Sequence, residues 1–214
     1  MIGNIVVQCD FDGTVTEEDI SFLILDAFAD GDWRQLLGQY REGKISVGYF
    51  NTTAFAMVKE NEATLKKFVE RNFNIRDGFG EMVKYCQKRS LRFVIVSNGM
   101  EFYIRMILEH IGLDDIEVIA AKADFRDDGI RASYIGPGGD RLQDGFKKEY
   151  ARQFLNDGYR MVYIGNGASD VPSARLASHV FATGEMLDYF RKEGISCTPF
   201  SDFKDVIKGL ELLE

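Results

Sequence analysis

The sequence predicts an α/β fold: a Rossmann-like doubly wound parallel sheet, with helices on both faces and a helical cap inserted after the first strand. Short apolar segments of strand length alternate with segments of helical period along most of the chain. The long stretch between the first two strand segments shows helical period only. Because connections in such folds are usually short, we expect this stretch to form the cap.

The strands and helices of the predicted core follow one another in order. We expect strands at residues 5–9, 91–96, 116–120, 161–164 and 179–182, and helices at residues 78–88, 100–110, 146–156, 171–177 and 185–192. A small hairpin is expected as well, because the alternating segments 122–126 and 130–135 flank Asp127-Asp128-Gly129. Residues 136–145 are expected to form a loop.

The predicted cap divides the chain into two units. Residues 1–15 and 77–214 form the core, and residues 16–76 form the cap over the carboxyl ends of the strands. The aromatic residues of the cap are expected to build its core, with one of them able to face a pocket; they are Trp33, Tyr40, Tyr49 and Phe50.

The composition excludes several classes of protein. With 45% hydrophobic and 28% charged residues the chain is not disordered, and a net charge of −8 argues against nucleic acid as a partner. No apolar run is long enough for a membrane span, and the first ten residues lack a basic secretory segment, so we expect a cytoplasmic protein without a membrane partner. The three cysteines lie far apart, which suggests neither disulfides nor a zinc site.

Polar residues follow three of the predicted strands. Asp10-Phe11-Asp12-Gly13-Thr14 follows the first strand, Ser97-Asn98-Gly99 the second, and Gly165-Asn166-Gly167-Ala168-Ser169-Asp170 the strand at 161–164. Taken alone, Asp-x-Asp-Gly is equally consistent with an ordinary turn. Open α/β sheets bind ligands at these strand ends, however, and Lys147 begins the helix before the third segment. Together they predict a carboxylate cluster with one ammonium and one hydroxyl group.

In this order, the four segments resemble the motifs of the haloacid dehalogenase-like phosphatases. The resemblance covers the whole chain, because residues 16–76 resemble the small first-type cap of that family. It implies a Mg²⁺-dependent phosphatase that hydrolyses a small phosphorylated metabolite through an aspartyl-phosphate. Asp10 would be the nucleophile, and Asp12 would protonate the leaving alcohol and then activate water. A haloalkanoate dehalogenase would need no acid at position 12.

The resemblance also implies a metal site. Asp10, the backbone carbonyl of Asp12 and Asp170 would bind Mg²⁺, with Asn166 as a ligand or a neighbour of one. Such a cation would neutralise clustered carboxylates, and oxygen ligands suit Mg²⁺. Relatives usually carry Asp at the position of Asn166, so this site has one negative charge fewer and is expected to bind Mg²⁺ more weakly.

Phosphate or substrate contacts are expected from Ser97, Asn98 and Lys147. Lys148 competes with Lys147 for this role, and the helical register favours Lys147. Thr14 would steady Asp12 or be a plain turn residue. Asp19 would be an acid at the cap entrance or simply a helix-start residue.

Within the family, the chain is most similar to the group that holds phosphoserine phosphatase and the methionine-salvage phosphatase acting on 2-hydroxy-3-keto-5-methylthiopentenyl-1-phosphate. The first motif, residues 75–79 and the hairpin look more like the second enzyme, although loop 136–145 lacks its cysteine-rich stretch. Three alternatives remain: a phosphoserine phosphatase-like enzyme, a weakly catalytic phosphate-binding or phospho-acceptor module, and a phosphomutase. The sequence leaves the oligomeric state open.

Overall fold

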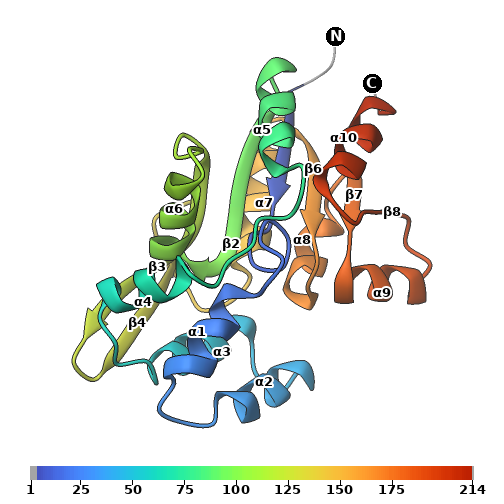
Figure 1. Cartoon of the computed structure of the whole chain (residues 1–214). Coiled ribbons are helices and arrows are strands. Elements are labelled where there is room, and N and C mark those ends of the chain that lie inside the picture. Colours follow the sequence, from blue (N-terminus) through green and yellow to red (C-terminus); the bar gives the residue numbers. More distant parts are fainter. Residues whose placement is uncertain (1–3, 214) are drawn as a thin grey trace.

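The computed structural model describes residues 4–213 and is built around one mixed β-sheet. Its strands are β1 (Ile5–Cys9), β2 (Arg92–Met100), β3 (Glu117–Arg126), β4 (Gly129–Ile135), β5 (Arg141–Leu142), β6 (Arg160–Gly165), β7 (His179–Ala182) and β8 (Thr198–Pro199). They are ordered β5-β4-β3-β2-β1-β6-β7-β8; β4 is antiparallel to both of its neighbours, β3 and β5, and all other neighbouring strands are parallel. Figure 1 shows the sheet with most of its strands labelled. The predicted α/β fold is confirmed.

Helices cover both faces of this sheet. Those of the core are α5 (Phe79–Lys88), α6 (Glu101–His110), α7 (Phe146–Asn156), α8 (Val171–Ala174), α9 (Gly184–Lys192) and α10 (Phe203–Glu211). Phe79 of α5 packs against Phe93, whereas the side chain of Gln8 donates to the backbone carbonyl of Lys147 in α7. Gln8 of β1 pairs with Val94 of β2, so these two side chains lie on the same face of the sheet. Phe93 comes directly before Val94 and faces the other side, because successive strand residues alternate between the faces. The helices α5 and α7 therefore lie on opposite faces.

The central strand β1 places the first motif in the middle of the sheet. It pairs in parallel with β2 and with β6, and Val6, Val7 and Cys9 have no exposed surface. Apart from Gln8, whose buried side chain donates to the Lys147 carbonyl, β1 is apolar, as burial on both faces requires. The residues after β1 therefore leave the sheet beside the carboxyl ends of both β2 and β6.

The cap consists of α1 (Ile20–Phe28), α2 (Trp33–Arg41), α3 (Val47–Phe55) and α4 (Glu62–Val69), which lie beyond the carboxyl edge of the sheet (Figure 1). The chain enters and leaves it at an antiparallel bridge between Thr16 and Ile75. The division of the chain at residues 15/16 and 76/77 stays a prediction. No helix within residues 4–213 is long and apolar enough to cross a bilayer.

The aromatic residues of the cap are only partly placed as the sequence predicts. Trp33 and Phe50 are buried, and Tyr40 stacks on Phe50 with ring centroids 5.9 Å apart. Tyr49, however, is 54% exposed, so its assignment to the cap core is wrong. It lies early in α3, and the inward face of this helix is taken by Gly48, Phe50 and other buried residues.

Several elements differ from the predicted ones. β2 runs to Met100 rather than ending at residue 96, and its pairing with β3 shifts register between Val96 and Met100. The predicted helix at 171–177 is only the short α8, preceded by a 3₁₀ turn, η1 (Ala168–Asp170). β5 and β8 are not predicted, since two-residue strands carry no readable period. α10 is not predicted either, although Phe203, Val206 and Leu210 bury one face of this helix.

The predicted hairpin fastens the cap to the core. Its two arms are β4 and the outer part of β3, and Ile130 N–H donates to the carbonyl of Val58 at 3.1 Å. Gly129 has φ +130°, and a Cβ there would overlap the backbone carbonyl of Ala56 at the end of α3. Only glycine therefore lets the hairpin and the cap approach this closely.

We expect Gly129→Ala to lower the free energy of unfolding by roughly 2 kcal/mol, because it adds both backbone strain and a steric overlap. Urea denaturation followed by circular dichroism measures this change. Gly138→Ala is the matched control, since a Cβ there meets only ordinary contacts. Equal stabilities of the two variants would contradict the proposed packing constraint.

Candidate active site

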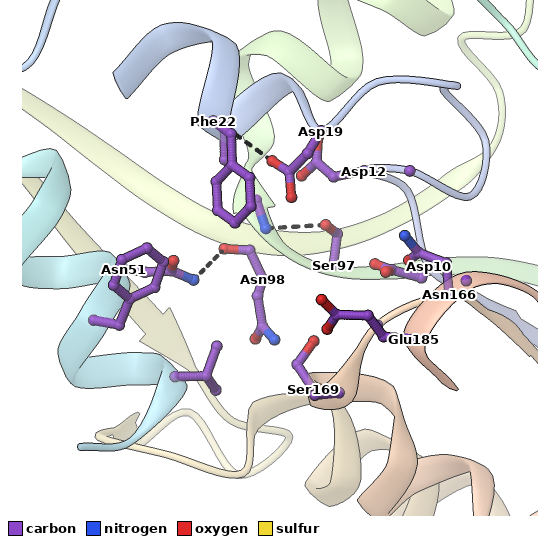
Figure 2. Close-up of a pocket in the computed structure, with 18 of the residues that line it drawn as sticks. Asp10, Asp12, Asp19, Phe22, Asn51, Ser97, Asn98, Asn166, Ser169 and Glu185 are labelled. Carbon is purple, nitrogen blue, oxygen red and sulfur yellow. Dashed lines mark hydrogen bonds between the residues drawn. The ribbon is translucent and has the colours of Figure 1, made fainter. Parts of the chain in front are cut away.

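The carboxyl ends of β1, β2 and β6 bring the predicted motifs together under the cap. A cavity of about 380 Å³ lies between this edge and α1, α2 and α3 (Figure 2). It is lined by the predicted residues Asp10, Asp12, Asp19, Ser97, Asn98, Lys147 and Asn166. Thr14 and Asp170, by contrast, are fully buried and lie outside its lining. Lys148 lines a neighbouring cavity.

Lys147 forms the electrostatic centre of the site. Its Nζ lies 2.6 Å from Asp10 Oδ1 and 2.6 Å from Asp170 Oδ1, and all three side chains are buried. Burial by itself would lower the pKa of Lys147, but the two carboxylates hold that pKa above its ordinary value. Lys147, rather than Lys148, is therefore the permanent cation beside Asp10.

Asp10 is held in an environment that disfavours its charge. Burial and the neighbouring charge of Asp170 raise its pKa to about 7, although Lys147 opposes them. At neutral pH the carboxyl group of Asp10 is therefore only partly ionised, and a cation bound beside it would favour its charged form. The environment of Asp10 fits a cation-binding group.

Asp170 is saturated with hydrogen bonds. Its Oδ1 accepts from Lys147 Nζ and from the Tyr163 hydroxyl at 2.7 Å, and its Oδ2 accepts from the backbone N–H groups of Asn166 and Gly167 at 3.0 and 2.9 Å. Burial opposes ionisation, but these donors, above all Lys147, hold the pKa of Asp170 below its ordinary value. A carboxylate has about four acceptor positions, so a metal contact would require one of these bonds to break.

Asn166 occupies the cavity wall where the sequence places a ligand or its neighbour. Its side-chain Oδ1 accepts from the hydroxyl of Thr14 at 3.0 Å, and a Cβ at Gly13 would overlap its amide nitrogen. Thr14 therefore steadies Asn166, not Asp12 as the sequence predicts. Gly13 has φ +72°, which lets the motif loop turn closely over the amide.

The oxygen donors of the site are compatible with Mg²⁺. Asp10 and Asn166 offer a carboxylate and an amide oxygen to the cavity, and hard oxygen ligands with retained waters are typical of this ion. Between residues 4 and 213 no group of three or more His, Cys, Asp or Glu side chains is arranged to hold a metal.

Asp12 is held by two donors that sequence reasoning did not single out. Tyr103 donates its hydroxyl proton to Asp12 Oδ2 at 2.6 Å, and Ile20 N–H donates to Asp12 Oδ1 at 3.2 Å. Burial and the nearby Asp19 raise the pKa of Asp12 well above its ordinary value. The side chain is therefore suited to carry a proton near neutral pH.

Ser97 and Asn98 reach the cavity from the irregular end of β2. Ser97 Oγ accepts from Gly99 N–H at 2.9 Å. The backbone carbonyl of Asn98 accepts from the Tyr134 hydroxyl at 2.7 Å and from the side chain of Asn51 at 3.3 Å (Figure 2). Asn51, a buried polar residue of α3 in the cap, is a further site residue, and no motif or period in the sequence marks it.

Asp19 serves in both of the ways that the sequence left open. Its Oδ1 caps α1 by accepting from Phe22 N–H at 2.9 Å, and the same side chain lines the cavity. Burial raises its pKa to about 6.

Across the cavity, Arg41 of the cap pairs with Glu185 of α9 at 3.2 Å. This pair links cap and core beside the site.

The fold and the site together define a class of Rossmann-like α/β proteins with a helical cap over paired aspartates that follow the central strand. A model of the family described as haloacid dehalogenase-like hydrolase matches residues 7–175, and the chain belongs to this family. The resemblance found in the sequence is thereby confirmed.

Relatives of this chain carry more specific names. It is 27% identical over 218 residues to the 2-hydroxy-3-keto-5-methylthiopentenyl-1-phosphate phosphatase of Brevibacillus brevis, covering 100% of this chain and 98% of the relative. It is 29% identical to the protein of the same name from Geobacillus kaustophilus, covering 100% and 99%. A solved phospho-aspartyl intermediate analogue of phosphoserine phosphatase superposes with a TM-score of 0.71 at 19% identity, covering 96% of this chain and 98% of that chain. A substrate-bound phosphoserine phosphatase superposes with a TM-score of 0.72 at 19% sequence identity, and the match covers 96% of this chain and 97% of that chain. These structures share the fold.

We expect Asp170→Asn to destabilise the protein by roughly 3 kcal/mol, because Lys147 loses one of its two buried partners. The Asn amide has a single acceptor oxygen and would turn its NH₂ group toward existing donors. Urea denaturation measures the change. Asp77→Asn is the control, since Asp77 forms an exposed ion pair with Lys204, and little change is expected there. A similar loss in both variants would refute the central role of the buried cluster.

Proposed function

We propose that this protein is a Mg²⁺-dependent phosphatase that hydrolyses a small phosphorylated metabolite through an aspartyl-phosphate on Asp10. The observation that carries the proposal is the placement of Asp10 at a capped cavity, 2.6 Å from Lys147 Nζ, with Asp12 and Ser97 lining the same cavity. The family membership and the names of the relatives support it.

The proposed reaction has two steps. Asp10 attacks phosphorus, an Asp10–phosphorus bond forms, and the ester bond to the leaving alcohol breaks while Asp12 gives that alcohol its proton. Asp12 then takes a proton from water, which attacks phosphorus and releases phosphate and free Asp10. The covalent intermediate divides one difficult displacement into two easier ones. The raised pKa of Asp12 suits the first step.

The remaining side chains are proposed to bind charge. Lys147 and Ser97 would hold the phosphoryl oxygens, and Asp170 would keep Lys147 in place. Asp10, the backbone carbonyl of Asp12 and Asn166 would hold Mg²⁺, with Asp170 behind them. When bound, the ion would supply positive charge to phosphoryl oxygens.

The cap side of the cavity favours a leaving group that is uncharged and partly apolar. Its wall includes Phe22, Leu37, Tyr40, Val47 and Phe50. Among the described residues that line the cavity, the cations are Lys147 and Arg41, and Arg41 is paired with Glu185. The methylthio compound named for the relatives, 2-hydroxy-3-keto-5-methylthiopentenyl-1-phosphate, matches this wall and is our leading substrate candidate.

Phosphoserine is the second candidate. Asp19 and Glu185 line the cavity and could receive an ammonium group, and Arg41 could receive a carboxylate if it released Glu185. This arrangement requires an existing ion pair to open, whereas the apolar wall is already in place. We therefore rank phosphoserine below the methylthio compound.

Phosphate release from both candidates and from an aryl phosphate tests the proposal. We expect hydrolysis that a chelator abolishes, faster with the methylthio compound than with phosphoserine, and a loss of at least about 10³-fold in Asp10→Asn. Acid-quench labelling should trap phosphate on the wild type only. Activity that persists in Asp10→Asn or with chelator would refute the mechanism. A labelled protein without turnover would instead support a phospho-acceptor module, and phosphate transfer without release a phosphomutase.

The affinity for Mg²⁺ is expected to rise roughly tenfold between pH 6 and pH 8, because the cation must displace the proton that Asp10 holds with a pKa of about 7. In the unfolded chain this pKa is near 3.8, so the metal-free fold binds the extra proton and loses stability as pH rises from about 4 to about 7. Titration calorimetry at both pH values measures the affinity. Asp10→Asn is the control and should remove the dependence. A pH-independent affinity in the wild type would contradict the prediction.

A further inference from the structure

Tyr103 is a buried tyrosine whose hydroxyl group points at the site rather than into the core. It lies in α6 with no exposed surface, and its ring packs edge-on against Phe102. A phenylalanine would satisfy this packing equally well. The hydroxyl instead lies 2.6 Å from Asp12 Oδ2, so its role must be sought in that contact.

We propose that Tyr103, anchored by Ser21, is the positioning residue that aims the carboxyl group of Asp12 at the leaving group of the substrate. This inference rests on the proposed phosphatase function. Asp12 sits on the loop after β1, where side-chain rotation would otherwise be free. One donor on each oxygen, Tyr103 on Oδ2 and Ile20 N–H on Oδ1, fixes the plane of the carboxyl group.

The anchor of Tyr103 comes from the cap. Ser21 Oγ lies 2.9 Å from the Tyr103 hydroxyl, and Ser21 is a buried residue of α1. The single hydroxyl proton of Tyr103 is directed at Asp12, so the hydroxyl of Ser21 is the donor in this pair. Ile20 also belongs to α1. Two of the three groups that orient Asp12 therefore move with the cap.

Gly99 makes room for this contact. A Cβ at this position would overlap both the hydroxyl of Tyr103 and Oδ2 of Asp12. Gly99 lies at the irregular end of β2, next to the predicted phosphate-binding residues. The absence of a side chain here allows core and cap to meet at Asp12.

The consequence is a specific kinetic effect. An alkyl alcohol leaves poorly without a proton, so its departure depends on the alignment of Asp12, whereas an aryl oxide such as p-nitrophenolate leaves readily unprotonated. The value of kcat/KM reports the steps through aspartyl-phosphate formation, before water attacks. Loss of positioning should thus lower kcat/KM for an alkyl phosphate more than for an aryl phosphate.

The test compares Tyr103→Phe with the wild type on the better alkyl phosphate candidate and on p-nitrophenyl phosphate. We expect kcat/KM to fall roughly 10- to 100-fold for the alkyl phosphate, and far less for the aryl one, since general acid catalysis contributes about 10²- to 10⁴-fold. Ser21→Ala should shift the ratio in the same direction by a smaller factor. Tyr150→Phe is the control, because Tyr150 donates to the Ile135 carbonyl outside the cavity lining.

Each outcome decides the proposal. An unchanged ratio of the two kcat/KM values in Tyr103→Phe, or an equal loss on both substrates, overturns it while the phosphatase proposal stands. If Tyr103→Phe does not fold, as judged by circular dichroism, the ratio in Ser21→Ala decides in the same way. An inactive wild type overturns both proposals, because Asp12 then has no leaving group to protonate.

Discussion

The buried cluster of Asp10, Lys147 and Asp170 is the interaction on which the rest of the structure depends. Three charges that are almost entirely buried are tolerable only if each is paired and hydrogen-bonded. Lys147 lies 2.6 Å from both carboxylates, and Asp170 receives four donors. Because these groups come from β1, α7 and the loop after β6, the cluster requires the central strands and α7 to be assembled in one arrangement.

The cap completes the site rather than merely covering it. Arg76, where the chain returns from the cap, donates to the carbonyls of Gly13 and Thr14 at 2.9 and 2.8 Å and so clamps the first motif loop. On the other side, Asn51 of α3 and Tyr134 of the hairpin meet at the carbonyl of Asn98. The loop after β1 and the end of β2 are thus fixed by contacts to or from the cap. The proposed substrate selection and acid–base chemistry would consequently depend on the same supports.

The net negative charge of the chain does not exclude an anionic substrate at this site. A net charge of −8 argues against extended polyanions, yet a phosphate monoester needs only a few positive groups. Lys147 supplies one of them, and a bound cation would offset the burial and the Asp170 charge that raise the pKa of Asp10 to about 7. Excess carboxylate at the site is therefore compatible with an anionic substrate when a cation is bound.

The sequence by itself determined the α/β class, and it predicted a helical cap after the first strand and the motif residues, since apolar periods and the motif segments are local along the chain. Asp10, Ser97 and Asn166 could be expected at one edge because parallel strands end together. Only the tertiary structure decided which groups contact them. Thr14 steadies Asn166, Asp170 holds Lys147 behind the cavity, and Tyr103 and Asn51 join the site from positions that read as ordinary helix. Such partners are far apart in sequence, and packing alone determines their distance and direction.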